Sequence, residues 1–278
     1  MPPVPTGTAS CMARARKRTS GSAADSGSAP AATSALYSPS AWLEETGLEP
    51  AAVAGHSLGE YSARVAAGAL PLSAALPLVR FRARAMQEAV PVGTGGMAAI
   101  LGLEADAVRA GCAQVSAEAG GPVEAANYND PKQIVISGAK AAVERACELL
   151  KAAGAKRALP LAVSAPFHSS LMKPAAERLR ERLAETPLAS PRIPVLNNID
   201  VAVQTEPDAI RDALYRQAFG PVRWVELALA LKARGLLRIG ECGPGRVLAG
   251  LFKRIDPAFE TANVFDPASL AEAKGVLA

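Results

Sequence analysis

The segment from Ala51 to Gly68 places an apolar stretch, a glycine-flanked serine and a small-residue helix pattern in direct succession, with the letters AAVAGHSLGEYSARVAAG. The apolar run predicts a short buried strand, and the alanine-rich stretch behind Gly59 predicts a helix. A buried strand that passes directly into a helix is typical of an α/β fold with a mostly parallel sheet. The turn between them has the spacing Gly55-x-Ser57-x-Gly59, which exposes the serine between strand and helix.

The rest of the chain predicts one large domain with a smaller domain inserted in it. Residues 35–94 and 164–278 alternate strand and helix patterns, so we expect them to form an α/β-hydrolase-like large domain. Residues 95–163 show the order β-α-β-β-α-β, which predicts an inserted ferredoxin-like subdomain. Residues 1–34 are first basic and then rich in Ser, Gly and Ala, so we expect them to be disordered.

Composition excludes several function classes. The formal net charge of +4 is too mild for a dedicated nucleic-acid-binding protein, but it suits an acidic partner or an anionic substrate. No apolar run approaches the roughly 18 residues needed to span a membrane, and no secretory signal is visible. The four cysteines have no metal-binding spacing and are expected as free thiols. These features predict a cytoplasmic protein without a metal site.

Ser57 is a candidate nucleophile. At the start of a helix its hydroxyl would lie near the N–H of Leu58, which we expect to stabilise an oxyanion. A helix N-cap is the alternative role for this serine. A nucleophilic serine needs a base, and the chain has only two histidines. His56 directly precedes the serine and should point away from it, which leaves His168 as the expected base.

A series of segments, in this order, resembles the malonyl-CoA:acyl-carrier-protein transacylase family of type II fatty acid synthesis. The similarity extends from about Trp42 to beyond Ile255 and is more specific than the serine motif alone. The segments are GHSLGEYSA, RxRAMQEAVPxGTGGMAAILGL, NYNDPKQIVISG, AGAKRALPLAVSAPFHSSLMKPAA, IPVLNNID, IRDALYRQ and GPGRVLAGLxKRI.

The resemblance implies a two-step mechanism. Malonyl-CoA would acylate Ser57, and the phosphopantetheine thiol of acyl carrier protein would then take the malonyl group. His168 would act as general base and then as general acid. In this family main-chain groups orient the histidine, and Gln217 matches the position that supplies a carbonyl, with Asn198 at a nearby strand end. The resemblance implies no cofactor, and we expect a monomer.

The resemblance also implies how the acyl group is selected. Arg82 matches the arginine that holds the malonyl carboxylate, a role that suits the two parallel hydrogen bonds of a guanidinium. Its neighbours Arg80 and Arg84 are expected to be solvated helix charges. In related polyketide acyltransferases a bulky residue before the histidine accompanies a choice of malonyl, and Phe167 is bulky.

The sequence departs from the family at its start. The family begins with a strand and a PGQGSQ loop, whose glutamine supplies a second oxyanion N–H, and residues 1–34 contain neither. We therefore expect the first strand and helices of the family to be missing, through a truncated or misassigned start. Losing one oxyanion donor costs about 10²–10³ in rate, and losing a central strand would expose sheet edges.

Two alternatives remain open from the sequence. One is a serine α/β-hydrolase or thioesterase, whose triad requires a carboxylate between serine and histidine in the chain; the candidates are Asp106, Glu124 and Asp130. The other is an inactive remnant that only docks the carrier protein. Acyl carrier proteins are acidic, so docking would use basic residues around His168, for which the candidates are Lys156, Arg157, Lys173, Arg180 and Arg182.

Overall fold

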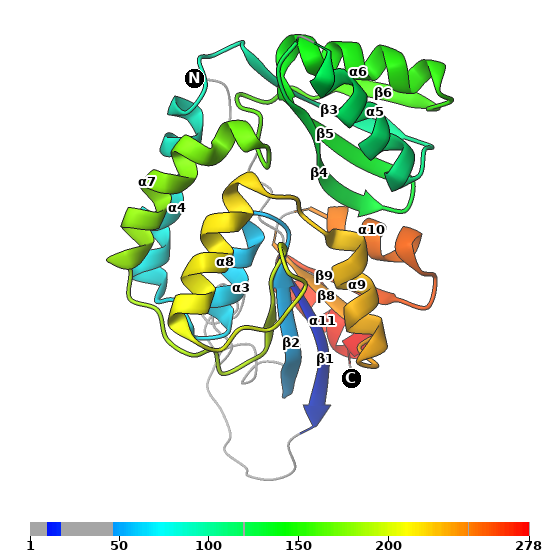
Figure 1. Ribbon diagram of the computed structural model, residues 1–278. Helices are drawn as coiled ribbons and strands as arrows, with labels where there is room; N and C mark the ends of the chain where they lie inside the picture. The colour runs from blue at the N-terminus through cyan, green and yellow to red at the C-terminus, as the bar shows by residue number, and fades with distance from the viewer. Residues whose placement is uncertain (1–9, 18–46, 119, 244, 278) are drawn as a thin grey trace.

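The computed structural model describes residues 10–17, 47–118, 120–243 and 245–277. They form two units, each built on its own sheet (Figure 1). The smaller unit, green in Figure 1, lies between α4 and the start of α7 in the chain. Within the described part of the chain, no helix has both the length and the apolar character needed to cross a bilayer.

The larger unit contains a five-stranded sheet in the order β7-β2-β1-β8-β9. Strands β2 and β7 are parallel, as are β8 and β9, while β1 is antiparallel to both β2 and β8. Four of the five strands therefore run in one direction. The strands are β1 (Ser10–Lys17), β2 (Leu48–Gly55), β7 (Val195–Leu196), β8 (Arg238–Cys242) and β9 (Glu260–Val264).

Strand β1 corrects the prediction that residues 1–34 lack regular structure and that a central strand is missing. Its first residue, Ser10, pairs with Gly55 on one side and Cys242 on the other, so β1 fills the position between β2 and β8. Strand pairing uses backbone groups, whereas the letters SCMARARK lack the continuous apolar run expected of a central strand. The remainder of the 1–34 segment lies outside the described residues.

Both faces of the large sheet are covered, as the alternation along β2 requires. Ala52 and Ala54 pack in the cluster that contains α9 and α10, whereas Val53 packs in the cluster that contains α3 and α11. Successive strand residues point to opposite faces, so β2 is buried on both. The helices are α3 (Gly59–Ala66), α9 (Trp224–Ala233), α10 (Val247–Ile255) and α11 (Pro267–Leu277).

A layer of helices lies beside α3 and supplies two segments of the site, from α4 and α8. Helices α4 (Leu72–Glu88), α7 (Lys173–Ala184) and α8 (Pro207–Phe219) share one apolar cluster with Tyr61 of α3. A single 3₁₀ turn, η1 (Ser170–Met172), leads into α7. This packing fixes α4 and α8 near the carboxyl end of β2, where ligands bind in open α/β sheets.

The smaller unit has an antiparallel sheet in the order β4-β5-β3-β6. Helices α5 and α6 cover one face, with Ala98 and Ile100 among the buried residues. The other face carries Met97 and Ala99, which pack with Phe167 from the loop before α7. The elements are β3 (Gly95–Leu101), α5 (Ala105–Ala117), β4 (Val123–Asp130), β5 (Gln133–Ala139), α6 (Lys140–Ala152) and β6 (Arg157–Pro160).

Candidate active site

Ser57 lies in the tight turn between β2 and α3, with a left-handed φ of 52°. The N–H of Gly59 donates to the His56 carbonyl, and the N–H of Glu60 donates to the Ser57 carbonyl. A Cβ on Gly55 would lie 1.9 Å from the Gly59 carbonyl carbon, so only glycine fits there. The local sequence therefore dictates a sharp turn that presents the serine hydroxyl.

Ser57 and His168 form a hydrogen-bonded pair. Ser57 Oγ lies 2.6 Å from His168 Nε2, although 111 positions separate the two residues in the chain. His168 is buried and also has a left-handed φ, of 60°. Such backbone conformations cost about 1–3 kcal/mol each and concentrate at functional sites. The structure therefore brings together the two residues that the sequence suggests as nucleophile and base.

Two carbonyl oxygens hold the other nitrogen of the His168 ring. Nδ1 lies 2.9 Å from the Gln217 carbonyl and 3.1 Å from the Gly220 carbonyl. Carbonyl oxygens only accept hydrogen bonds, so Nδ1 must carry the proton and Nε2 is free to accept one from Ser57. The main chain of the last turn of α8 and of Gly220 directly after it therefore sets the tautomer that a general base requires.

Burial keeps the His168 ring neutral. Desolvation, aided by the nearby Arg82 cation, lowers the pKa of His168 from 6.5 to about 3. The two carbonyl contacts oppose this change but do not outweigh it. A neutral imidazole in contact with a serine hydroxyl can accept its proton over the whole physiological pH range.

His56 points away from the serine hydroxyl, as its position in the turn predicts. Its Nε2 lies 2.8 Å from Asn129 Oδ1 of β4, and its ring lies 5.4 Å from the Trp224 ring. Burial lowers the pKa of His56 as well. This histidine therefore connects the serine turn to the smaller unit and does not contact Ser57 Oγ.

Arg82 approaches the same hydroxyl from α4. Its Nη2 lies 3.4 Å from Ser57 Oγ, and its guanidinium stacks 5.7 Å from the centre of the Tyr61 ring. The side chain is buried, and its Nε has no hydrogen-bond partner among the described residues. Arg80 and Arg84, by contrast, are exposed. Arg82 therefore lies beside the Ser57 hydroxyl and has a donor, Nε, that no described residue accepts.

The two amides of the serine turn differ in availability. The Ser57 N–H donates to Asn198 Oδ1 at 2.7 Å. The Leu58 N–H donates to no acceptor within the described ranges. At the start of α3, the Leu58 N–H is thus the unpaired amide of this turn, and its role toward an oxyanion stays a prediction.

None of the candidate carboxylates contacts His168. Asp106 pairs with Arg109, Glu124 accepts the Ser170 N–H at 2.7 Å, and Asp130 pairs with Arg254 at 2.8 Å. Because carbonyls occupy the position that a triad carboxylate would need, this geometry disfavours the serine-hydrolase alternative.

Comparisons with known proteins agree with this geometry. The family model described as the acyl transferase domain matches residues 29–238. A malonyl CoA-acyl carrier protein transacylase of Haemophilus influenzae is 52% identical over 240 residues, which is 86% of this chain and 76% of that protein. The chain belongs to the malonyl CoA-acyl carrier protein transacylase family.

Solved structures similar to this transacylase-family chain have the same fold. An acyl-carrier-protein S-malonyltransferase from Burkholderia pseudomallei is 61% identical with a TM-score of 0.83, covering 88% of this chain and 78% of that one. A malonyl-transacylase solved in complex with a type II polyketide acyl-carrier protein is 48% identical, with the same TM-score and the same coverage.

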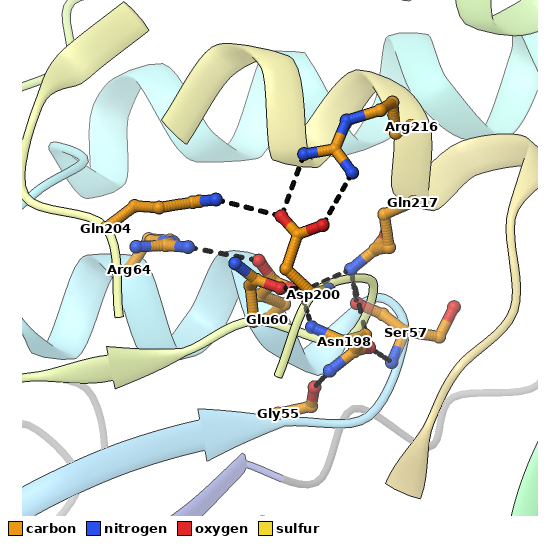
Figure 2. Close-up of polar contacts among 10 residues, drawn as sticks. Gly55, Ser57, Glu60, Arg64, Asn198, Asp200, Gln204, Arg216 and Gln217 are labelled. Carbon is orange, nitrogen blue, oxygen red and sulfur yellow. Dashed lines mark hydrogen bonds and ion pairs between the residues drawn. The ribbon is translucent and has the colours of Figure 1, made fainter. Parts of the chain in front are cut away.

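Sequence reasoning missed one buried residue of this transacylase-family site. Glu60, in the first turn of α3, is fully buried and accepts hydrogen bonds from the Asn198 N–H and from Gln217 Nε2 (Figure 2). The available signal was the spacing of Glu60 and Arg64, an i, i+4 ion pair in a helix otherwise made of small and apolar residues.

Proposed function

We propose that this chain transfers the malonyl group of malonyl-CoA to the phosphopantetheine thiol of acyl carrier protein, through a seryl ester, in fatty acid biosynthesis. The observation that carries the proposal is the contact of Ser57 Oγ with both a neutral His168 and a buried Arg82. The names of the similar proteins support the same reaction.

The first half-reaction uses the pair directly. Ser57 Oγ attacks the thioester carbonyl while His168 Nε2 takes its proton, and the Leu58 N–H stabilises the oxyanion. The C–S bond then breaks, and the histidine proton passes to the coenzyme A thiolate. In the second half-reaction the carrier thiol gives its proton to His168 Nε2 and attacks the ester carbonyl; the C–O bond to Ser57 then breaks, and His168 returns the proton to Ser57 Oγ. No cofactor is needed.

Arg82 is the proposed reader of the substrate. A guanidinium forms two parallel hydrogen bonds with a carboxylate, and malonyl carries a carboxylate where acetyl carries none. Phe167, which packs against the small sheet and precedes the base, supports a choice of malonyl over methylmalonyl. Gln217 and Asn198 serve as positioning residues.

The wider expectations are part of the proposal. The chain acts as a cytoplasmic monomer, with acyl carrier protein as its partner and without nucleic acid or membrane. The larger unit is α/β-hydrolase-like. The smaller unit is ferredoxin-like, which the sheet order β4-β5-β3-β6 and the two helices on one face support.

Intact-mass spectrometry after mixing with malonyl-CoA tests the reaction. The wild-type chain should gain one malonyl group, and Ser57→Ala should gain none because no hydroxyl remains at the turn. Ser62→Ala, one turn into α3, is the matched control and should be malonylated normally. A malonyl adduct on Ser57→Ala would overturn the assignment of the nucleophile.

A further inference from the structure

A fully buried carboxyl lies directly behind the serine turn and has no role in the proposed chemistry. Glu60 belongs to the first turn of α3 and its side chain is 0% exposed. Oε2 accepts the Gln217 amide at 2.8 Å and the Asn198 N–H at 2.9 Å, while Oε1 accepts from Arg64 at 3.2 Å. One side chain thus joins α3, the end of β7 and α8.

The two residues that Glu60 holds are the ones that hold the nucleophile. Asn198 accepts the Ser57 N–H at 2.7 Å and donates to the Gly55 carbonyl at 2.7 Å. Gln217 donates to the Ser57 carbonyl at 3.1 Å. The strained backbone of Ser57 is therefore fixed on its N–H side and its carbonyl side by groups that share Glu60 (Figure 2).

Gln217 also reaches the base. Its side chain contacts Ser57 and Glu60, whereas its main-chain carbonyl accepts from His168 Nδ1 at 2.9 Å. A shift of Gln217 would therefore move nucleophile and base relative to each other. A misplacement of about 1 Å between reacting groups can cost a hundredfold in rate.

Stability alone does not account for the buried pair. Two nitrogens of Arg64, Nε and Nη1, have no hydrogen-bond partner among the described residues, although the side chain is 0% exposed. Buried ion pairs replaced by apolar residues of similar volume often leave a protein equally stable. What the pair does achieve is to orient the Glu60 carboxyl, since Arg64 holds Oε1 and leaves Oε2 to Asn198 and Gln217.

A second, more exposed pair fastens the same two segments. Arg216 makes two hydrogen bonds with Asp200, at 2.7 and 2.8 Å (Figure 2). Arg216 directly precedes Gln217 in the chain, and Asp200 follows Asn198 by two positions. The segments that carry Asn198 and Gln217 are thus held together in two places, and Glu60 is the place nearer to Ser57.

We propose that Glu60 is a positioning residue that aligns Ser57 with His168 through Asn198 and Gln217. This inference rests on the proposed function only in the choice of malonyl-CoA as the substrate. The alignment itself does not depend on the substrate, because any reaction of Ser57 with His168 as the base requires it.

Two double variants isolate the role. Glu60→Gln/Arg64→Met keeps an amide oxygen that can accept from Asn198 and Gln217, and Glu60→Met/Arg64→Met removes it. Both lose the Arg64 charge. We would measure single-turnover malonylation, the KM for malonyl-CoA, and phosphonylation of Ser57 by an uncharged fluorophosphonate, with thermal unfolding as the check on folding.

The expected result is a rate loss that follows the acceptor oxygen. The Met/Met variant should lose about tenfold to a hundredfold in both Ser57 reactions with an unchanged KM, and the Gln/Met variant should keep most of the wild-type rate. Equal rates in the two variants would overturn the proposal.

If the Met/Met variant does not fold, Gln217→Met takes its place, because it removes the amide through which Glu60 acts; an unchanged phosphonylation rate would then overturn the proposal. If the wild-type chain reacts with the fluorophosphonate but not with malonyl-CoA, the proposed function fails while the test of Glu60 stands.

Discussion

In the proposed reaction Ser57 gives its proton to His168, a residue that must stay neutral while it is enclosed by protein. His168 contacts Ser57 Oγ through Nε2 and two carbonyls through Nδ1, so both ring nitrogens are used. The carbonyls replace the carboxylate of a catalytic triad. Because they carry no full charge, burial dominates and the pKa of His168 falls to about 3.

The lowered pKa predicts an unusually flat pH profile. The rate of Ser57 malonylation in single turnovers should stay constant between about pH 5 and pH 8, because His168 is already neutral at the lower end. Quenched-flow mass spectrometry measures this rate. A sigmoidal loss of rate centred near pH 6.5, the ordinary value for histidine, would contradict the burial argument.

The same shift has a consequence for stability. The pKa is lower in the folded chain than in the unfolded one, so the unfolded chain binds more protons between about pH 3 and pH 6.5. The free energy of unfolding therefore falls as the pH drops through that window. His56, whose pKa is also lowered by burial, acts in the same direction.

Arg82 should control the choice of acyl group more than the chemistry. Arg82→Ala leaves the malonyl carboxylate without its partner, and hydrogen bonds to charged groups contribute about 1.5–3 kcal/mol. We expect malonyl transfer to fall at least about tenfold, while acetyl transfer holds or rises. Arg82→Lys should rescue only in part, because an ammonium cannot form two parallel hydrogen bonds.

Transfer from malonyl-CoA and acetyl-CoA, measured side by side, decides this. Arg84→Ala, an exposed neighbour on the same helix, is the matched control and should change neither rate. A malonyl-to-acetyl ratio that Arg82→Ala leaves unchanged would rule out the proposed carboxylate contact.

Among the elements, β4 of the smaller unit contacts three of the segments that build the site. Asn129 contacts His56 beside the nucleophile, and Glu124 accepts the Ser170 N–H just after the base. The backbone of β4 also pairs with Val222, two residues after the Gly220 carbonyl that holds His168. The inserted unit is therefore part of the scaffold that sets the relative positions of nucleophile and base.

The elements also show what the sequence could and could not predict. Strand β2, helix α3 and the Ser57–His168 pair follow from a local apolar pattern, glycine spacing and the scarcity of histidine. Strand β1 could not be predicted, because its place depends on backbone pairing with β2 and β8. Glu60 escaped notice because its burial depends on Gln217, which lies 157 positions away.

At the scale of the whole molecule, the five basic residues expected to dock the carrier protein fall into different settings. Arg180 already pairs with Glu177 of α7, and Arg182 pairs with Glu185 directly after that helix. Lys173 lies over the Phe219 ring. Lys156 and Arg157 are exposed at β6, an edge strand, and form no ion pair within the described ranges. Two partly exposed apolar residues lie beside them in the chain, Leu159 at 43% exposure and Leu161 at 38%.

Docking should therefore depend on the β6 edge. An exposed, unpaired cation retains its full attraction for an acidic partner, whereas a paired one is already neutralised. Lys156→Glu/Arg157→Glu should raise the KM for acyl carrier protein by about tenfold or more. The rate at which malonyl-CoA malonylates Ser57 should not change, because this step does not involve the carrier protein. Arg180→Glu/Arg182→Glu is the matched control with the same change in charge, and we expect a much smaller effect on this KM.

Added salt should raise the wild-type KM for acyl carrier protein and bring it closer to that of the β6 variant, since screening removes the attraction that the variant lacks. Equal effects of the two double variants, or a KM for the carrier protein that salt does not change, would place the docking surface elsewhere on the molecule.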